Sequence, residues 1–425
     1  MARIFTMLIG AVIASAVFAT AAVASAAETR SDAPLTLNAA INRALAYAPA
    51  ADVAIAQADF SDAKVNEARA PLFPNVALNG EYNQAPGYSQ IITNRGMTLA
   101  QLALDYTVFD GGRRSADLRA ARYSAQATRL GVNAARSQIV FATTVAYFDL
   151  QRARATASEL RRSRERLAQD QTIVENLRGS GRANAGDVLK IRSVRDAAEL
   201  ALAAADQAAE HAAIVLGSLV GAPAAADLRI AEVTDLPPQP GGEIASSPVF
   251  RAAERQLEAA HSAVAAAGAE RLPTVRLALT SGFEGIDPPA TFDRHLGASY
   301  DGAISVPIFE GGLIRAHIDE AQAAQHTALA ELRQIELDLR RDFADTLARY
   351  RGARAQLGLL GPAQTTADDA FAIAWTRFLG GGNVTLLEVL DAYQQGQSLR
   401  VARLDDEFSL RAAAAQAALI LGAER

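Results

Sequence analysis

The sequence contains no cysteine, only two lysines and few aromatic residues. Without cysteine, the chain can form neither a disulfide nor a thiol nucleophile, and it cannot carry a lipid on an N-terminal cysteine. Arginine supplies nearly all the positive charge, since Lys64 and Lys190 are the only lysines, and the formal net charge is −6. This acidic balance gives no electrostatic basis for binding nucleic acid.

Long apolar runs are absent too, except at the N-terminus. Arg3 precedes an apolar run that ends in the small residues Ala24-Ser25-Ala26, so residues 1–26 are predicted to be a secretory signal peptide. The alternative, a membrane anchor, fits less well because no charged stop-transfer segment follows the run. After residue 26 no window of about 18 apolar residues is free of charge, so this part could cross a membrane only with strands.

Signals for catalysis and for bound cofactors are also lacking. The five histidines (211, 261, 295, 317 and 326) do not have metal-ligand spacing, and no nucleophile elbow joins serine, histidine and aspartate. The glycines at 380–382 are not followed by the Lys-Ser/Thr of a phosphate loop. We therefore predict no catalytic residue, no cofactor and no metal site, and a protein that is not an enzyme.

What the sequence does contain is a duplication. A proline before a Val-containing strand, a Phe-acid-Gly-Gly motif and an acid-Val-Leu motif occur twice in the same order. The pairs and their separations are Pro74 and Pro273 (199), Phe109 and Phe309 (200), and Val188 and Val389 (201). Shared Ala-rich composition would not place proline and glycine landmarks at a common interval, so the chain is predicted to be a tandem repeat.

Each repeat is expected to comprise a helix, a β-hairpin and two long helices. The predicted ranges are 27–221 for the first repeat, 222–246 for a Pro/Gly-rich linker and 247–425 for the second repeat. The predicted hairpins are 75–109 and 274–309, and the predicted long helices are 113–178, 187–220, 313–378 and 384–422. The first helix is expected to start after a Thr36 cap and to run to Arg69, and Gly361-Pro362 is expected to kink or unwind a long helix.

The first long helix of each repeat is far longer than a compact domain needs. It has no proline in the first repeat, and at 1.5 Å per residue it would span roughly 90 to 100 Å. Apolar residues recur every seventh position, which favours coiled-coil packing. This seam is formed by Ile139, Ala146, Ala153, Leu160, Leu167 and Val174.

The predicted strands alternate between apolar and polar residues, as in Val76, Leu78 and Tyr82 against Ala77, Asn79 and Glu81. About ten residues with this period are typical of a transmembrane barrel, although an amphipathic hairpin on a soluble core gives the same pattern. Four strands cannot close a barrel, whereas eight, twelve or sixteen can. Open edges in lipid are costly, so we expect chains to pool their strands.

Taken together, the Pro-x-Val starts, the Phe-[Asp/Glu]-Gly-Gly motifs and the Gly-x₅-[Asp/Glu]-Val-Leu motifs resemble the TolC-like outer-membrane factor family, also called outer membrane efflux proteins. The resemblance covers essentially the whole chain after residue 26. It implies a mostly helical fold with four strands per chain, a homotrimeric twelve-stranded barrel in the outer membrane of a Gram-negative bacterium, in contact with its lipid, and a helical tunnel in the periplasm. It also implies an exit duct of a tripartite efflux pump or type I secretion system, docked to a periplasmic adaptor and an inner-membrane RND or ABC transporter.

The same resemblance points to an acidic ring at the tunnel mouth. Glu388 and Asp391 are three residues apart and share a helix face, so a trimer would place six carboxylates near the entrance. Asp187 is the first-repeat counterpart of Glu388, whereas Lys190 stands opposite Asp391. The alternative is that these are first-turn acids favoured by the helix dipole.

Three further sets follow from the resemblance. The predicted adaptor-contacting turns contain Gly179, Gly181, Gly186, Gly380, Gly381 and Gly382. The predicted strand-to-helix junctions contain Phe109, Gly111, Gly112, Phe309, Gly311 and Gly312. The tyrosine and arginine ties of the family's closed gate fall near Phe378-Leu379 and Val384, which do not match, and Arg377 or Arg182 could take their place.

Two other classes of protein, a soluble adaptor and an exported enzyme, are alternatives to the outer-membrane channel. A soluble periplasmic coiled-coil adaptor or scaffold also has helical hairpins, but it would be expected to carry one hairpin flanked by lipoyl-like and β-barrel segments, not two equivalent repeats. An exported enzyme has no supporting constellation of residues.

Overall fold

The computed structural model describes residues 34–89, 91, 95–223, 228–286 and 296–422. The expected signal peptide and parts of the expected loops after the first strand of each hairpin lie outside these residues. The chain from Leu35 onward forms one compact unit, to which everything below refers. In the part of the chain that is described, no helix has both the length and the apolar character needed to cross a membrane.

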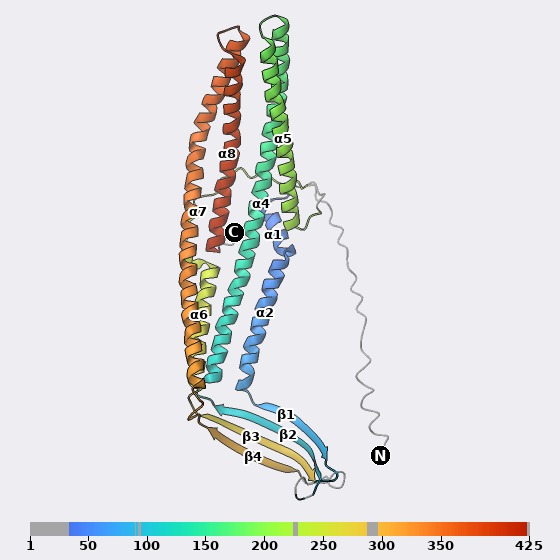
Figure 1. The fold of residues 1–425 in the computed structure, drawn as a ribbon, viewed down its shortest axis with the longest axis vertical. Helices are drawn as coiled ribbons and strands as arrows, with labels where there is room; N and C mark the ends of the chain where they lie inside the picture. Colours follow the sequence, from blue (N-terminus) through green and yellow to red (C-terminus); the bar gives the residue numbers. More distant parts are fainter. Residues whose placement is uncertain (1–33, 90, 92–94, 224–227, 287–295, 423–425) are drawn as a thin grey trace, which may run out of the picture. The chain divides into compact units, whose positions relative to one another are not determined.

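Both halves share the order of a helix, two strands and two long helices, and they differ in the short elements (Figure 1). The first half contains α1 (Leu37–Tyr47), α2 (Pro49–Arg69), η1 (Ala70–Leu72), β1 (Asn75–Gln84), β2 (Gly96–Phe109), α4 (Arg113–Gly179) and α5 (Ala185–Leu219). The second half contains η2 (Ile244–Ser246), α6 (Pro248–Ala269), β3 (Thr274–Ile286), β4 (Gly297–Ser305), α7 (Leu313–Leu379) and α8 (Leu386–Leu421). The helices α4 and α7 both have 67 residues, so the duplication extends to the longest element.

The predicted single helix from Leu37 to Arg69 is wrong. Thr36 caps α1 as expected, accepting a hydrogen bond from the backbone N–H of Ala39 at 3.3 Å. The chain then leaves the helical region at Ala48 (φ −71°, ψ 114°), and Pro49 starts α2. The reason is that proline disfavours helical backbone in the preceding residue and is well suited to the first position of a helix.

The second hairpin is shorter than predicted, because β4 ends at Ser305 and not near Phe309. Ser305 already lies opposite Thr274, the first residue of β3, so later residues have no strand to pair with. Pro307 also lacks the N–H that a ladder requires. In the first repeat, β2 does reach Phe109, which lies opposite Val275 after a register shift.

Of the two outcomes expected at Gly361-Pro362, a kink or an unwinding, the unwinding does not occur, since α7 continues through Pro362. A proline removes one backbone donor from a helix and crowds the carbonyl four residues earlier. Here the residue four positions earlier is Gly358. The hydroxyls of Thr365 and Thr366 donate to the carbonyls of Gly361 and Pro362 at 3.2 and 3.0 Å, in the helical turn that follows the proline.

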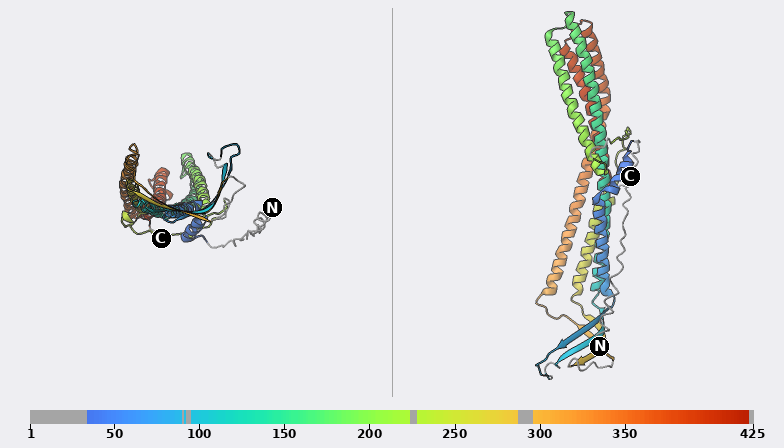
Figure 2. Two further views of the ribbon diagram at one scale, coloured as in Figure 1. Left: turned by 90° about the horizontal axis from the view of Figure 1, so that it is seen from below. Right: turned by 90° about the vertical axis from the view of Figure 1, so that its right-hand side faces the viewer.

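The long helices stand side by side in a single layer (Figure 2). Near the strands, packing neighbours follow the order α2, α4, α6 and α7, and toward the turns the order is α5, α4, α8 and α7. Five of the six residues of the predicted seam on α4 are buried, and Leu160 is half-buried. A single layer has no second layer to enclose a core, so much apolar helix surface stays exposed.

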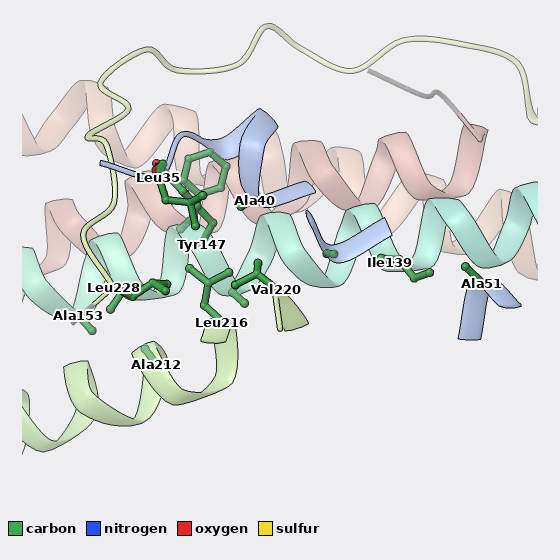
Figure 3. Close-up of a cluster of buried hydrophobic side chains, with 14 residues drawn as sticks. Leu35, Ala40, Ala51, Ile139, Tyr147, Ala153, Ala212, Leu216, Val220 and Leu228 are labelled. Atoms are coloured by element: carbon green, nitrogen blue, oxygen red, sulfur yellow. The ribbon is translucent and has the colours of Figure 1, made fainter. Parts of the chain in front are cut away.

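A buried apolar cluster lies where the linker between the repeats crosses the helices (Figure 3). Tyr147 of α4 is fully buried at its centre. Its hydroxyl lies 2.9 Å from the carbonyl oxygen of Leu35 and 2.5 Å from that of Ala231. Further along the linker, Tyr350 of α7 donates to the carbonyl of Pro237 at 2.8 Å. The linker is thereby attached to the long helices of both repeats.

Candidate membrane face and tunnel mouth

The four strands form one antiparallel sheet in the order β1-β2-β3-β4, which joins the hairpins of the two repeats. Its register places apolar residues opposite one another on one face. Leu78 lies opposite Leu102, and Leu104 lies opposite Leu279, which in turn lies opposite Tyr300. Leu78 and Tyr300 are both 81% exposed, so this face is an apolar surface that the single chain leaves uncovered.

The other face of the sheet is polar. Asn79 lies opposite Gln101, and Ala278 lies between Asp105 and Asp301. Because side chains alternate along a strand, one register separates the two faces on all four strands. A sheet that is apolar on one side and polar on the other suits hydrocarbon on one side and water on the other.

Both edges of the sheet are open within the described chain. The strand β1 pairs only with β2, and β4 pairs only with β3. Unpaired backbone groups in hydrocarbon cost several kcal/mol each. The sheet is therefore complete only if strands from outside this chain pair with its edges.

The predicted junction glycines lie between each second strand and the following long helix. Gly111 and Gly112 have φ of +67° and +87°, and Gly311 and Gly312 have φ of +62° and +91°. Positive φ is strained for residues with a side chain, and these tight bends turn the chain from strand into helix. Phe109 ends β2 at this bend, whereas Phe309 follows the shortened β4 and is 87% exposed.

Asp110 organises the first of these junctions. Its carboxylate accepts from the backbone N–H groups of Gly112 and Arg114 at 3.1 and 2.9 Å and from Arg114 Nε at 2.8 Å. Burial alone would raise the pKa of Asp110, but its hydrogen bonds and its charged partner Arg114 lower it. The start of α4 is thus fixed directly beside the end of β2.

At the opposite ends of the long helices, Glu388 and Asp187 both take part in capping boxes. The backbone N–H of Glu388 donates to the Thr385 hydroxyl at 3.3 Å, and the Glu388 carboxylate accepts from the Thr385 N–H at 3.2 Å. In the same way, the backbone N–H of Asp187 donates to Asn184 Oδ1 at 3.0 Å, and the Asp187 carboxylate accepts from the Asn184 N–H at 2.8 Å. These caps start α8 at Leu386 and α5 at Ala185, two residues away from the predicted 384 and 187.

Asp391 lies one turn further along α8 and differs from Glu388. It is exposed, and no ion pair or hydrogen bond of its carboxylate occurs among the described residues. Lys190, its counterpart on α5, is exposed as well. A capping role therefore accounts for the positions of Glu388 and Asp187 but not for Asp391.

The glycine turns close the two helical hairpins. Gly179 ends α4, Gly181 has φ of +76°, and Gly186 lies in the first turn of α5. In the second turn Gly380 follows α7, and Gly381 has φ of +74° beside Gly382. In both turns a glycine with positive φ reverses the chain after the helix ends.

Arg182 connects the two turns. Its Nη2 donates to the carbonyl of Leu379, the last residue of α7. The last carbonyls of a helix lack partners within it and carry partial negative charge, so a guanidinium is favoured there. Nearby, Phe378 stacks on Trp375, with ring centroids 6.0 Å apart. Arg377 makes no such tie through its side chain in the part of the chain that is described.

The sequence analysis missed a group of polar residues further along the helices. Tyr393, Gln397 and Arg400 of α8 contact Ser163 and Glu159 of α4. The spacing of four and three residues places the three α8 side chains on one face. Polar residues at this spacing on the packed face of a helix were the available signal.

A known protein family matches both repeats of the chain. The family model described as outer membrane efflux protein matches residues 40–222 and 241–423. This chain belongs to the outer membrane efflux protein family. The two matched segments correspond to the two repeats, so the match covers most of the chain.

Individual relatives agree with this family. The chain is 28% identical to protein CyaE of Bordetella pertussis over 337 residues, which is 76% of this chain and 70% of CyaE. It is 23% identical to the outer membrane protein TolC of Escherichia coli over 82% of this chain and 75% of TolC. It is 31% identical to SrpC of Pseudomonas putida over only 40% of this chain and 36% of SrpC.

Solved structures share the fold. The outer membrane protein VceC of Vibrio cholerae gives a TM-score of 0.81 at 21% identity, covering 91% of this chain and 96% of VceC. CusC gives a TM-score of 0.84 at 20% identity, covering 91% of this chain and 92% of CusC. The predicted fold class, mostly helical with four strands per chain in a tandem repeat, is confirmed.

Membership also confirms the predicted kind of protein and its location. This outer membrane efflux protein is an outer-membrane channel with a large helical extension in the periplasm of a Gram-negative bacterium. The alternative of a soluble adaptor has no support from these matches. Channels of this family are efflux ducts, a kind of protein that is not an enzyme.

Proposed function

We propose that three copies of this chain join their sheets edge to edge into a twelve-stranded barrel and their long helices into one tunnel. The proposal is supported by the two open sheet edges, the continuous apolar face and the single layer of helices. An eight-stranded barrel from two copies would be filled by its own side chains. Twelve or more strands leave a lumen, and the family resemblance favours three copies.

In this proposal the channel is passive and receives its cargo from partners. A periplasmic adaptor contacts the glycine turns at 179–186 and 380–382, and an RND or ABC transporter in the inner membrane drives export. SrpC is named for a solvent efflux pump and OpmQ of Pseudomonas aeruginosa for pyoverdine export. Cargo thus differs among relatives of one fold, so the transporter rather than the duct is expected to select it.

The acidic ring is part of the same proposal. Glu388 and Asp391 of three chains would place six carboxylates at the tunnel mouth, and Asp187 would add three more. Crowded like charges in a pore attract cations and exclude anions. The capping box does not oppose this role, because the Glu388 side chain stays exposed while it accepts the Thr385 N–H.

The edge pairing can be tested with introduced cysteines, since the native chain has none. We expect Leu78→Cys on β1, combined with Ala298→Cys, Tyr300→Cys or Gly302→Cys on β4, to give covalent dimers and trimers on oxidation for at least one pair. Denaturing gels without reductant measure the products. As a control, Ala103→Cys on the internal strand β2 should give none. Absence of intermolecular products from every β1–β4 pair would contradict the barrel.

The tie between the turns gives a second prediction. In Arg182→Met the carboxyl end of α7 loses its cationic partner. We therefore expect the fraction of channels in the low-conductance state in planar bilayers to fall roughly threefold, which corresponds to the loss of one exposed charged contact. Arg178→Met, which removes an exposed arginine of the same turn, is the matched control. Equal behaviour of the two variants would show that Arg182 does not hold the turns together.

A further inference from the structure

A band of polar contacts joins the first repeat to the second, several turns away from the glycine turns. We define the inter-repeat clamp as Glu159 and Ser163 of α4, Asp368 of α7, and Tyr393, Gln397 and Arg400 of α8. All six side chains take part in hydrogen bonds that join α4 to α8 or α7 to α8. The contacts surround a cavity of about 240 Å³ lined by five of these residues.

Arg400 connects three helices. Its Nε donates to Glu159 Oε1 at 2.6 Å, and its Nη1 donates to Asp368 Oδ1 at 2.7 Å. The side chain of Arg400 is 24% exposed and that of Glu159 is 13% exposed. Arg162 Nη2 approaches the second oxygen of Glu159 at 2.8 Å. The planar guanidinium holds the two carboxylates in a fixed arrangement through separate nitrogens, whereas an ammonium is a single point charge on a flexible stem.

A second set of contacts lies beside this ion pair. The buried Tyr393 hydroxyl donates to Ser163 Oγ at 2.8 Å, and Ser163 Oγ donates to Gln397 Oε1 at 2.6 Å. Burial raises the pKa of Tyr393, which keeps the phenol protonated as a donor. These bonds fix the distance and the register between α4 and α8.

The backbone of α8 makes room for the clamp. A Cβ on Gly396 would lie 3.1 Å from Asp368 Oδ1 and 3.4 Å from Arg400 Nη1. Glycine lowers helix stability by up to about 1 kcal/mol. Its presence inside α8 is explained by the close approach of the Arg400–Asp368 pair.

The clamp differs in kind from the contacts near the turns. There the helices pack through apolar side chains, including Leu167, Val174, Ile191 and Leu390. Apolar burial is non-directional, whereas hydrogen-bonded ion pairs require a specific geometry. Half-buried ion pairs add little net stability when both partners are present, but removing one partner leaves a costly unpaired charge.

We propose that Arg400 is a positioning residue that sets the angle between the α7–α8 hairpin and α4, and so fixes the resting width of the tunnel mouth. The proposal rests on the channel function given above. Loss of the Arg400 contacts lets the second hairpin move away from the first and populates states with a wider tunnel mouth. Arg400 acts through the hairpin, because it lies away from the turns and from the acidic residues at the mouth.

The test compares Arg400→Met with Arg403→Met in the full-length trimer. Arg403 lies on the same helix, and within the described part of the chain it pairs only with Glu407 four residues later, so its removal breaks no ion pair between the described helices. We expect Arg400→Met to raise the occupancy of high-conductance states about tenfold, as loss of a partly buried charge partner implies, and Arg403→Met to leave it unchanged. Arg400→Lys, which keeps the charge but not the two-carboxylate geometry, should give an intermediate value.

A double-mutant cycle assigns the effect to the Glu159 contact. If Arg400 acts through Glu159, Glu159→Gln combined with Arg400→Met should open the channel less than the two single effects predict together. Additive effects would assign opening to general destabilisation and overturn the clamp.

A second readout does not depend on conductance. Trp375 is the single tryptophan of the chain, and Phe371 lies between it and Tyr393, with centroid distances of 6.3 and 5.3 Å. Acrylamide quenching of Trp375 should increase in Arg400→Met and not in Arg403→Met. If wild-type trimers conduct but Arg400→Met changes neither the conductance nor the quenching, the clamp is overturned and the channel function stands. Wild-type trimers that do not conduct would overturn the channel, while the quenching would still test the clamp.

Discussion

In the double variant Glu388→Gln and Asp391→Asn, the cation-over-anion permeability ratio is expected to fall by at least roughly threefold, because six carboxylates near one constriction are lost. Glutamine is accepted in a capping box, so Glu388→Gln removes the charge without removing the start of α8. Reversal potentials of purified trimers under a KCl gradient in planar bilayers measure the ratio. The effect should shrink as the salt concentration rises, since salt screens exposed charges.

A gain of selectivity is expected from the opposite change. Lys190→Asp would give the first repeat the acid that Asp391 supplies in the second, and it should raise the permeability ratio. For the double variant, Asp369→Asn, which removes an exposed acid in α7, is the control for a general loss of negative charge. If the double variant and Lys190→Asp both keep the wild-type ratio, the acidic ring is not at the constriction.

The second large effect is expected on the sheet. Leu102→Arg places a charge on the apolar face of β2, at a cost of about 2–4 kcal/mol near the middle of a bilayer. We therefore expect the yield of outer-membrane trimer to fall more than about tenfold, since each 1.4 kcal/mol is a factor of ten. Membrane fractionation and heat-modifiability on denaturing gels measure the yield.

The neighbouring residue provides a closely matched control. Gln101 precedes Leu102 on the same strand and points to the opposite, polar face of the sheet. Gln101→Arg should leave the trimer yield within about twofold of wild type, because that face contacts water. Equal loss in the two variants would mean that the apolar face does not meet lipid.

Much of the fold could be predicted because its signals are local. Proline and glycine mark the ends of the long helices, and the seven-residue seam on α4 identifies a packed face without any knowledge of its partner. The break at Ala48 was missed because the prediction placed Pro49 within one continuous helix and not at the start of a second one. The end of β4 could not be located, because it depends on where β3 begins across the sheet.

The functional residues divide in the same way. Glu388 and Asp187 follow a turn and lie within a motif, so position in the sequence was enough to single them out. Arg400, Glu159 and Asp368 are far apart in the chain and meet only because helices of different repeats pack together. Their charges are ordinary for the exposed face of a helix, and the only local signal is the spacing that places Arg400 on one face of α8 with Tyr393 and Gln397.

The open edges of the sheet have a consequence for how the protein is made. A newly exported copy that folded alone would present two edge strands with unpaired backbone groups and a broad apolar surface to the aqueous periplasm. Both features promote aggregation. Folding of the sheet is therefore expected to wait for encounter with sister copies, which makes maturation depend on concentration. Dilution or slow export would then favour proteolysis over membrane insertion. The rate at which new chains are exported, rather than the stability of the folded chain, would limit the number of assembled channels.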